Sequence, residues 1–79
     1  MSEKTVQAGR YRHYKGKEYL VYGVATHSET GEQVVTYRCL YGDYSLWVRP
    51  LTMFLEYVLI NNHRQPRFTL IDSTIPDEY

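Results

Sequence analysis

Residues 37–56, YRCLYGDYSLWVRPLTMFLE, constrain the fold of this chain more than any other stretch. The stretch begins with a strand-like alternation of side chains, and Gly42 marks a reversal. Pro50 lacks a backbone N–H, so it suits the first position of a helical turn, and it favours an extended conformation at Arg49. We therefore expect a strand to end at about Arg49 and a short apolar helical turn to follow over residues 50–55.

The remainder of the chain consists of short strand-like runs separated by turn residues. Gly23 interrupts one of these runs, where it indicates a bend or a bulge. Asn61-Asn62 predicts a tight reversal, because asparagine tolerates positive φ, and Pro66 places the strand after it at a sheet edge. We expect the last two strands to pair with each other across this reversal. The expected strands are residues 10–14, 18–26, 33–41, 44–49, 56–60 and 67–71.

This pattern predicts an all-β fold, namely a small SH3-like barrel of five to six short antiparallel strands with one helical turn before the last strand pair. An OB-fold is disfavoured because no segment has the caps and the period of a longer helix. The 79 residues suffice for a single domain with a thin core. We expect a flexible N-terminus over residues 1–8, the barrel over residues 9–71 and a loosely held acidic tail over residues 72–79.

Cysteine and histidine usage argues against a metal site. The single Cys39 excludes an internal disulfide and a multi-cysteine zinc site, and the three histidines are too scattered for a ligand set. We expect neither a metal nor a cofactor. The chain shows no apolar run of the kind found in signal peptides or membrane anchors, so a cytoplasmic location is the simplest expectation.

The charge balance bears on the class of partner. Nine basic and nine acidic side chains give a formal net charge of zero, which disfavours indiscriminate nucleic-acid binding. An alternative hypothesis is a nucleic-acid binder whose basic residues are gathered by folding. Those residues are Arg10, Arg12, Lys15, Lys17, Arg64 and Arg67.

The segments GRYRHYKGKEY, GVATHSET and VVTYRCLYGDYSLWVRPLTMF together resemble the DUF1653 family, small bacterial proteins of unassigned function. The resemblance runs from about Gly9 to Phe68 and is most specific over YRCLYGDYSLWVRPLTMF. It implies an SH3-like barrel and no particular activity. The family's HSET, YR, YG, WVRP and MF positions correspond to residues 27–30, 37–38, 41–42, 47–50 and 53–54.

Trp47 and Arg49 are the strongest candidates for a binding site. They lie two positions apart on an expected strand, so their side chains leave the same face. An arginine beside an indole can stack on it and can hold a carboxylate or a phosphate with its planar fork. The alternative interpretation is that Trp47 fills the core while Arg49 pairs with Glu56, Asp43 or a carbonyl. The candidate ligand-binding residues are Tyr37, Arg38, Tyr41, Trp47 and Arg49, with His27 at the rim.

His27 and Glu29 are weaker candidates for catalysis. A histidine oriented by a carboxylate beside Ser28 could act as an acid or a base in a small hydrolase or transferase, with Arg49 stabilising an anion. The simpler interpretation is an exposed turn whose side chains bond to nearby backbone groups.

We therefore expect a cytoplasmic binding module rather than an enzyme. Its partner would be an anionic or aromatic ligand such as a peptide, a nucleotide or RNA. No membrane partner is expected, and the oligomeric state stays open, since an edge strand offers a pairing surface.

Overall fold

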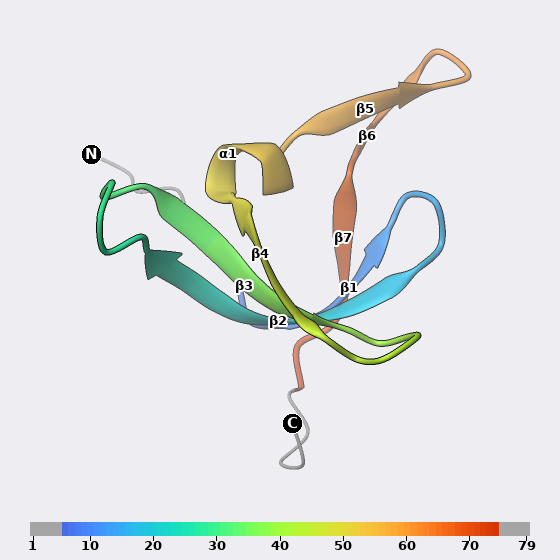
Figure 1. Ribbon diagram of the computed structural model, residues 1–79. Coiled ribbons are helices and arrows are strands. Elements are labelled where there is room, and N and C mark those ends of the chain that lie inside the picture. The colour runs from blue at the N-terminus through green and yellow to red at the C-terminus, as the bar shows by residue number, and fades with distance from the viewer. Residues whose placement is uncertain (1–5, 75–79) are drawn as a thin grey trace.

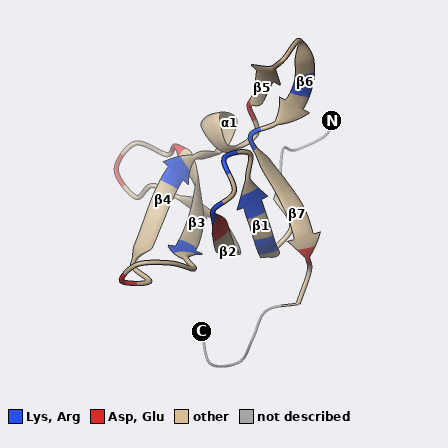
Figure 2. Ribbon diagram, turned by 90° about the vertical axis from the view of Figure 1, so that its right-hand side faces the viewer, with Lys and Arg blue, Asp and Glu red and all other residues tan. Residues whose placement is uncertain are grey.

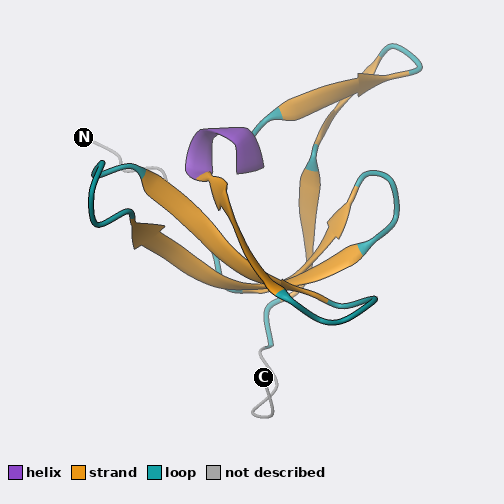
Figure 3. Cartoon of the chain, viewed as in Figure 1, coloured by secondary structure: helices purple, strands orange, loops and turns teal. Residues whose placement is uncertain are grey.

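The structure is a computed structural model that describes residues 6–74 of the chain (Figure 1). It contains seven strands and one short helix, as the colouring in Figure 3 shows. The elements are β1 (Gly9–His13), β2 (Glu18–Thr26), β3 (Gln33–Cys39), β4 (Leu46–Pro50), α1 (Leu51–Phe54), β5 (Tyr57–Ile60), β6 (His63–Pro66) and β7 (Phe68–Asp72). The all-β class predicted from the sequence is confirmed, and the helical turn begins directly after Pro50 as expected.

Five of the strands form one antiparallel sheet in the order β4-β3-β2-β1-β7, and β5 pairs with β6 alone. The large sheet curls around one side of the molecule, and β4 and β7 are its edges (Figure 1). These two strands do not pair with each other, so the described residues form an open sheet and not the closed barrel predicted from the sequence. The prediction also counted five to six strands instead of seven.

The long strand β2 bends where the sequence predicted it. The pairing of β2 with β3 shifts between Val21 and Gly23, which leaves Tyr22 as the extra residue of a bulge. Gly23 has φ of 151°, a value that side-chain-bearing residues rarely adopt. The bend lets the two ends of β2 follow the curl of the sheet.

Asn61 and Asn62 form a tight reversal, with φ values of 51° and 66°. The strand on its far side, however, is β6 and not the expected residues 67–71, because Ile60 pairs with His63. The sequence HRQP of β6 has no apolar alternation, and this strand was therefore missed. Residues 67–71, which were expected to pair with residues 56–60, belong to β7. This strand pairs with β1 and places Phe68 opposite His13.

The β5–β6 hairpin stands away from the sheet (Figure 1). Its base is closed by a backbone hydrogen bond of 2.9 Å, which the Arg67 N–H donates to the Glu56 carbonyl. Two of its large apolar side chains, Tyr57 and Leu59, are 56% and 68% exposed. The hairpin therefore contributes little to the core.

The core lies inside the curl of the sheet, where α1 closes one end. Phe54 of α1 stacks on Phe68 with ring centroids 4.3 Å apart and meets the edge of Tyr11 at 5.3 Å. Apolar side chains from β1, β2 and β3 complete this packing. The core cluster contains Val6, Tyr11, Val21, Val35, Tyr37, Leu51, Phe54 and Phe68.

The expected flexible termini fall partly outside the described residues, at positions 1–5 and 75–79. In the described part of the N-terminal segment, Val6 is buried in the core and Gln7 accepts a hydrogen bond of 2.7 Å from the Tyr11 hydroxyl. In the C-terminal segment, Asp72 is the last residue of β7. Among residues 6–74, no helix has the length and apolar character needed to cross a membrane.

Candidate functional site

Trp47 lies at the surface. It pairs with Tyr37 of β3 on the inner face of the sheet, but it stands on the edge strand β4 and its side chain is 55% exposed. The indole N–H donates a 2.8 Å hydrogen bond to the Ser45 hydroxyl. The indole therefore presents its apolar surface, and not a free donor, to the surroundings.

Arg49 is the next β4 residue on the same inner face, opposite Val35. Its guanidinium carbon lies 5.5 Å from the centre of the Phe68 ring. Within residues 6–74 its side chain makes neither an ion pair nor a hydrogen bond, and its buried Nε has no acceptor. The pairing with Glu56 that the alternative interpretation named does not occur, since Glu56 accepts a 3.0 Å hydrogen bond from Arg67.

His13 approaches the same ring from β1, with its centroid 4.9 Å from that of Phe68. Burial lowers the pKa of His13, and the positive charges of Arg67, Arg49 and Lys15 lower this pKa further. The imidazole Nδ1 accepts a 3.1 Å hydrogen bond from the Lys15 backbone N–H. In the neutral ring the proton therefore sits on Nε2, which is a donor.

Arg67 completes this group of donors. Its Nε is also buried without a hydrogen-bond acceptor, although its terminal nitrogen pairs with Glu56. Its guanidinium carbon lies 5.9 Å from the Tyr14 ring. We call His13, Arg49, Arg67 and Phe68 the Arg49 cluster. Arg49 and His13 contact the Phe68 ring, and Arg67 is close enough to His13 to lower its pKa. Three donors thus lie near one another, which suits a negatively charged ligand.

The other candidate ligand-binding residues do not join this cluster. Tyr37 is buried and packs edge-on against Tyr19 at 5.3 Å. Arg38 lies on the opposite face of β3, where it donates to the Tyr22 hydroxyl at 3.0 Å and the Tyr44 carbonyl at 2.7 Å. These contacts satisfy the Arg38 side chain internally. Of the five candidates, only Trp47 and Arg49 share an accessible face.

Tyr41 lies in the turn after β3 and serves the fold. Its hydroxyl lies 3.0 Å from that of Tyr19, and this hydrogen bond, with one from Cys39 and with burial, raises the pKa of Tyr41. The ammonium of Lys17 sits 4.4 Å from the centre of the Tyr41 ring. The Tyr41 side chain is thus engaged by Tyr19 and Lys17 of the same protein.

His27 forms part of a turn. Its Nδ1 accepts backbone hydrogen bonds from Glu29 at 3.2 Å and Thr30 at 3.4 Å. No hydrogen bond joins the side chains of His27 and Glu29, and both residues are exposed. The geometry is that of the simpler interpretation, a side chain that stabilises an exposed connection.

The basic residues of the nucleic-acid hypothesis are spread over several elements (Figure 2). Arg12 pairs with Glu18 at 3.0 Å on the main sheet. Arg64 lies on the projecting hairpin, 4.5 Å from the centre of the Tyr57 ring. Only Arg67 belongs to the Arg49 cluster.

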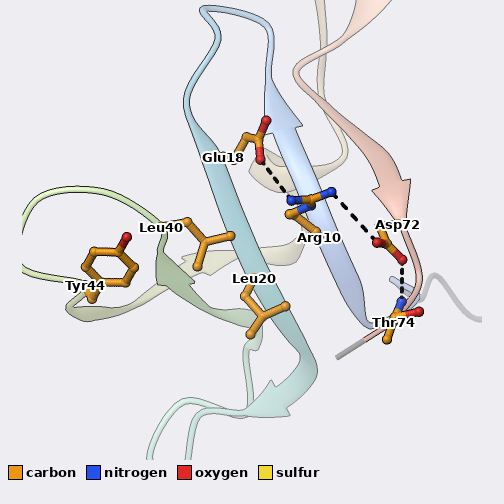
Figure 4. A pocket seen from close by; sticks show the side chains of 7 residues that line it. All are labelled: Arg10, Glu18, Leu20, Leu40, Tyr44, Asp72 and Thr74. Atoms are coloured by element: carbon orange, nitrogen blue, oxygen red, sulfur yellow. Dashed lines mark hydrogen bonds and ion pairs between the residues drawn. The ribbon is translucent and has the colours of Figure 1, made fainter. Parts of the chain in front are cut away.

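A hollow of about 360 Å³ lies on the outer face of the sheet (Figure 4). Arg10 stands in it between Glu18 at 3.7 Å and Asp72 at 3.8 Å. Because two carboxylates flank this arginine, the hollow offers no uncompensated positive charge. It is a weaker candidate for an anion than the Arg49 cluster. Its lining is Arg10, Glu18, Leu20, Leu40, Tyr44, Asp72 and Thr74.

Sequence reasoning missed His13 and Phe68 as site residues and placed Arg67 only among general basic residues. The pairing of β1 with β7 brings them to Arg49, and this pairing joins opposite ends of the chain. One local signal for these residues is present in the sequence: His13 stands next to Tyr14, and Arg67 next to Phe68. This signal does not show that the two segments meet.

Comparisons with known proteins agree with this fold. A family model described as "Protein of unknown function (DUF1653)" matches residues 9–70. A crystal structure of a DUF1653 protein from Bordetella bronchiseptica superposes with a TM-score of 0.79 at 38% sequence identity, covering 91% of this chain and 95% of that one. No curated protein matches the chain.

Proposed function

Because the chain belongs to the DUF1653 family, whose description assigns no function, we propose from the geometry of its own residues that it is a binding module for an anionic ligand. The observation that carries this proposal is the Arg49 guanidinium, which has no acceptor among the described residues. A buried donor without an acceptor costs about 1–3 kcal/mol. A carboxylate or phosphate oxygen that reached the guanidinium would supply the acceptor that the described residues do not.

The neighbours of Arg49 strengthen the proposal. Arg67 has a second buried Nε without an acceptor, and the neutral His13 ring offers its Nε2–H. Two arginines close enough to lower the pKa of the same histidine create a positive potential that Glu56 offsets only in part. An anion would relieve this repulsion.

Trp47 adds an apolar surface to the anion site. It leaves the sheet on the same face as Arg49, two positions earlier in β4. A ligand that carries an anionic group beside an apolar or aromatic group would contact both side chains. The proposed surface keeps Trp47 and Arg49 from the residues expected from the sequence, and it has His13 and Arg67 in place of Tyr37, Arg38 and Tyr41.

The other two functions have less support. An enzyme built on His27 and Glu29 would need a hydrogen bond between their side chains. Instead, the His27 Nδ1 accepts hydrogen bonds from the backbone N–H groups of Glu29 and Thr30. A nucleic-acid binder would need Arg10 and Arg12 free, whereas both face Glu18.

The proposal also includes the fold class and the cellular location that we expect from the sequence. A curled antiparallel sheet followed by one helical turn is also found in SH3-like barrels. We therefore propose that this chain is an SH3-like module whose sheet stays open. A bacterial, cytoplasmic setting fits a chain whose single cysteine, Cys39, is free and buried.

The test is a titration with inorganic phosphate, followed by NMR of the arginine Nε–H groups and the histidine rings. We expect saturable shifts of Arg49 and His13. The variant Arg49→Gln should weaken binding about tenfold or more, as expected for a charged hydrogen bond. The matched control Arg64→Gln removes the same charge from the projecting hairpin and should leave the affinity nearly unchanged. The proposal fails if no shift saturates, or if both variants weaken binding equally.

A further inference from the structure

Strand β4 is an unprotected edge. Within residues 6–74 it pairs only with β3, in a register that runs without a bulge from Val34 opposite Pro50 to Arg38 opposite Leu46. Its consecutive residues Leu46, Trp47 and Val48 are 61%, 55% and 59% exposed. Edge strands are usually protected by lysines, bulges or covering segments. Before Arg49 and the terminal proline, β4 has no lysine and no bulge, and none of the described strands pairs with its free side.

The register identifies which backbone groups of β4 are free. The Cys39 N–H donates to the Ser45 carbonyl at 3.0 Å, so this opposed pair is hydrogen-bonded. Hydrogen-bonded pairs alternate along an antiparallel ladder, so Trp47 and Arg49 also direct their backbone groups toward β3. The N–H and C=O groups of Leu46 and Val48 therefore point away from the sheet.

The side chains along this edge differ between the two faces. Leu46 and Val48 lie on the outer face. Together with Thr36 and with Trp47, whose position on β4 belongs to the inner face, they line a shallow, mainly apolar hollow of about 440 Å³ along the edge of the sheet. Trp47 and Arg49 lie on the inner face. The edge thus combines free backbone groups, an apolar surface and one cation without a partner.

We propose that the β4 edge binds an extended peptide as an additional antiparallel strand, and that an acidic side chain of this peptide is the anion held by Arg49. The inference rests on the proposed function and assigns its ligand class. A residue opposite Val48 would exchange two backbone hydrogen bonds with it. The acidic residue would lie opposite Arg49, and a large apolar residue two positions later would lie opposite Trp47.

Charge favours a peptide partner over a second copy of this chain. Strand β4 has the sequence LWVRP and contains no acid. Two copies joined through their β4 strands would leave both Arg49 side chains without a carboxylate. An acidic peptide supplies the missing charge.

The probe is the capped peptide acetyl-Thr-Glu-Thr-Leu-Thr-amide, which places its Glu opposite Arg49 and its Leu opposite Trp47. We expect saturable NMR shifts along β4 and at the Arg49 Nε–H. Replacing Glu by Gln in the peptide should weaken binding about tenfold. Methylating the central peptide nitrogen, which removes the donor opposite Val48, should weaken it about three- to tenfold.

The matched protein variants are Val48→Pro and Val48→Thr. Proline removes the outward N–H of residue 48 and leaves the β3 ladder intact, whereas threonine keeps that donor. We expect Val48→Pro to weaken the peptide about three- to tenfold and Val48→Thr to have little effect. Neither variant should change the affinity for inorganic phosphate, and this also reports that the fold is kept.

Three results would overturn the inference in different ways. If phosphate binds at Arg49 but nitrogen methylation does not weaken the peptide, the peptide inference is wrong and the proposed function stands. If neither probe binds, both are wrong. If sedimentation shows a dimer of the free protein that Val48→Pro abolishes, the edge serves a second copy instead of a peptide.

Discussion

The Arg49 guanidinium carbon lies 5.5 Å from the centre of the Phe68 ring, although the two residues belong to opposite edges of the main sheet. Strands β4 and β7 are thus connected by side chains where a closed barrel would connect them by backbone hydrogen bonds. The position of Arg49 consequently depends on how far the sheet curls. Changes in the core beneath Phe68 should reach the anion site.

Phe68→Leu tests this connection. The substitution removes the stack on Phe54 and the ring beneath Arg49, so we expect a loss of about 1–3 kcal/mol in unfolding free energy, measured with urea, and weaker phosphate binding. Phe54→Leu is the control, because it removes the same stack without touching Arg49. It should cost similar stability and affect phosphate binding less. Equal loss of binding in both variants would contradict a direct role for the Phe68 ring.

Glu56→Gln should strengthen anion binding. Glu56 holds Arg67 at 3.0 Å and is the acid that offsets the positive charge of the Arg49 cluster. Removing its charge leaves Arg67 available, whereas the stability should change by only about 0–1 kcal/mol because the pair is at the surface. Phosphate titration measures the gain, and Glu29→Gln, which removes an acid from the distant turn at residues 27–32, should give none. Unchanged or weaker phosphate binding in Glu56→Gln would count against the cluster.

The stability of the protein should fall as the pH decreases from about 6.5, the ordinary pKa of histidine. The pKa of His13 is lower in the folded protein than in the unfolded chain. Between these two pKa values the unfolded chain binds a proton at His13 and the folded protein does not, so protonation favours unfolding. The decline should continue until the pH reaches the lowered folded value. Urea titrations between pH 8 and 5 should show a shallower slope of stability against pH for His13→Gln than for the parent protein. An identical slope in His13→Gln would exclude this group as the cause.

Gly9→Ala should loosen the pairing of β1 with β7. A Cβ at Gly9 would lie 2.5 Å from the Asp72 carbonyl oxygen, and the φ of 147° already disfavours a side chain. Gly16→Ala is the control, since Gly16 has φ of 110° and no heavy atom within 4 Å of an added Cβ. In both variants backbone strain should lower the unfolding free energy by about 1–3 kcal/mol, and Gly9→Ala should lower it further because of the clash. Faster amide exchange in β1 and β7 should accompany the larger loss. Equal losses in the two variants would show that the clash relaxes freely.

Much of the fold follows from local sequence signals. Gly23 predicted the bulge, Pro50 the change from strand to helical turn, and Asn61-Asn62 the tight reversal. Alternation placed Trp47 and Arg49 on one face, which the register confirms. Each of these features depends on residues close together in the chain.

The open sheet and the full site could not be predicted in the same way. The contact of Arg49 with Phe68 and His13 depends on which strands pair across the whole chain, and β6 carries no apolar alternation to reveal it. Whether Trp47 was core or surface depended on β4 being an edge, which local patterns do not specify.

The hydrogen bond between Glu56 and Arg67 closes the base of the β5–β6 hairpin, so residues 57–66 leave and rejoin the domain at one point. A segment attached in this manner can be exchanged without lengthening or shortening the path of the chain through the core. A short turn could replace it to give a minimal version of the domain, and a fluorescent peptide or an affinity tag could be carried there at a distance from β4.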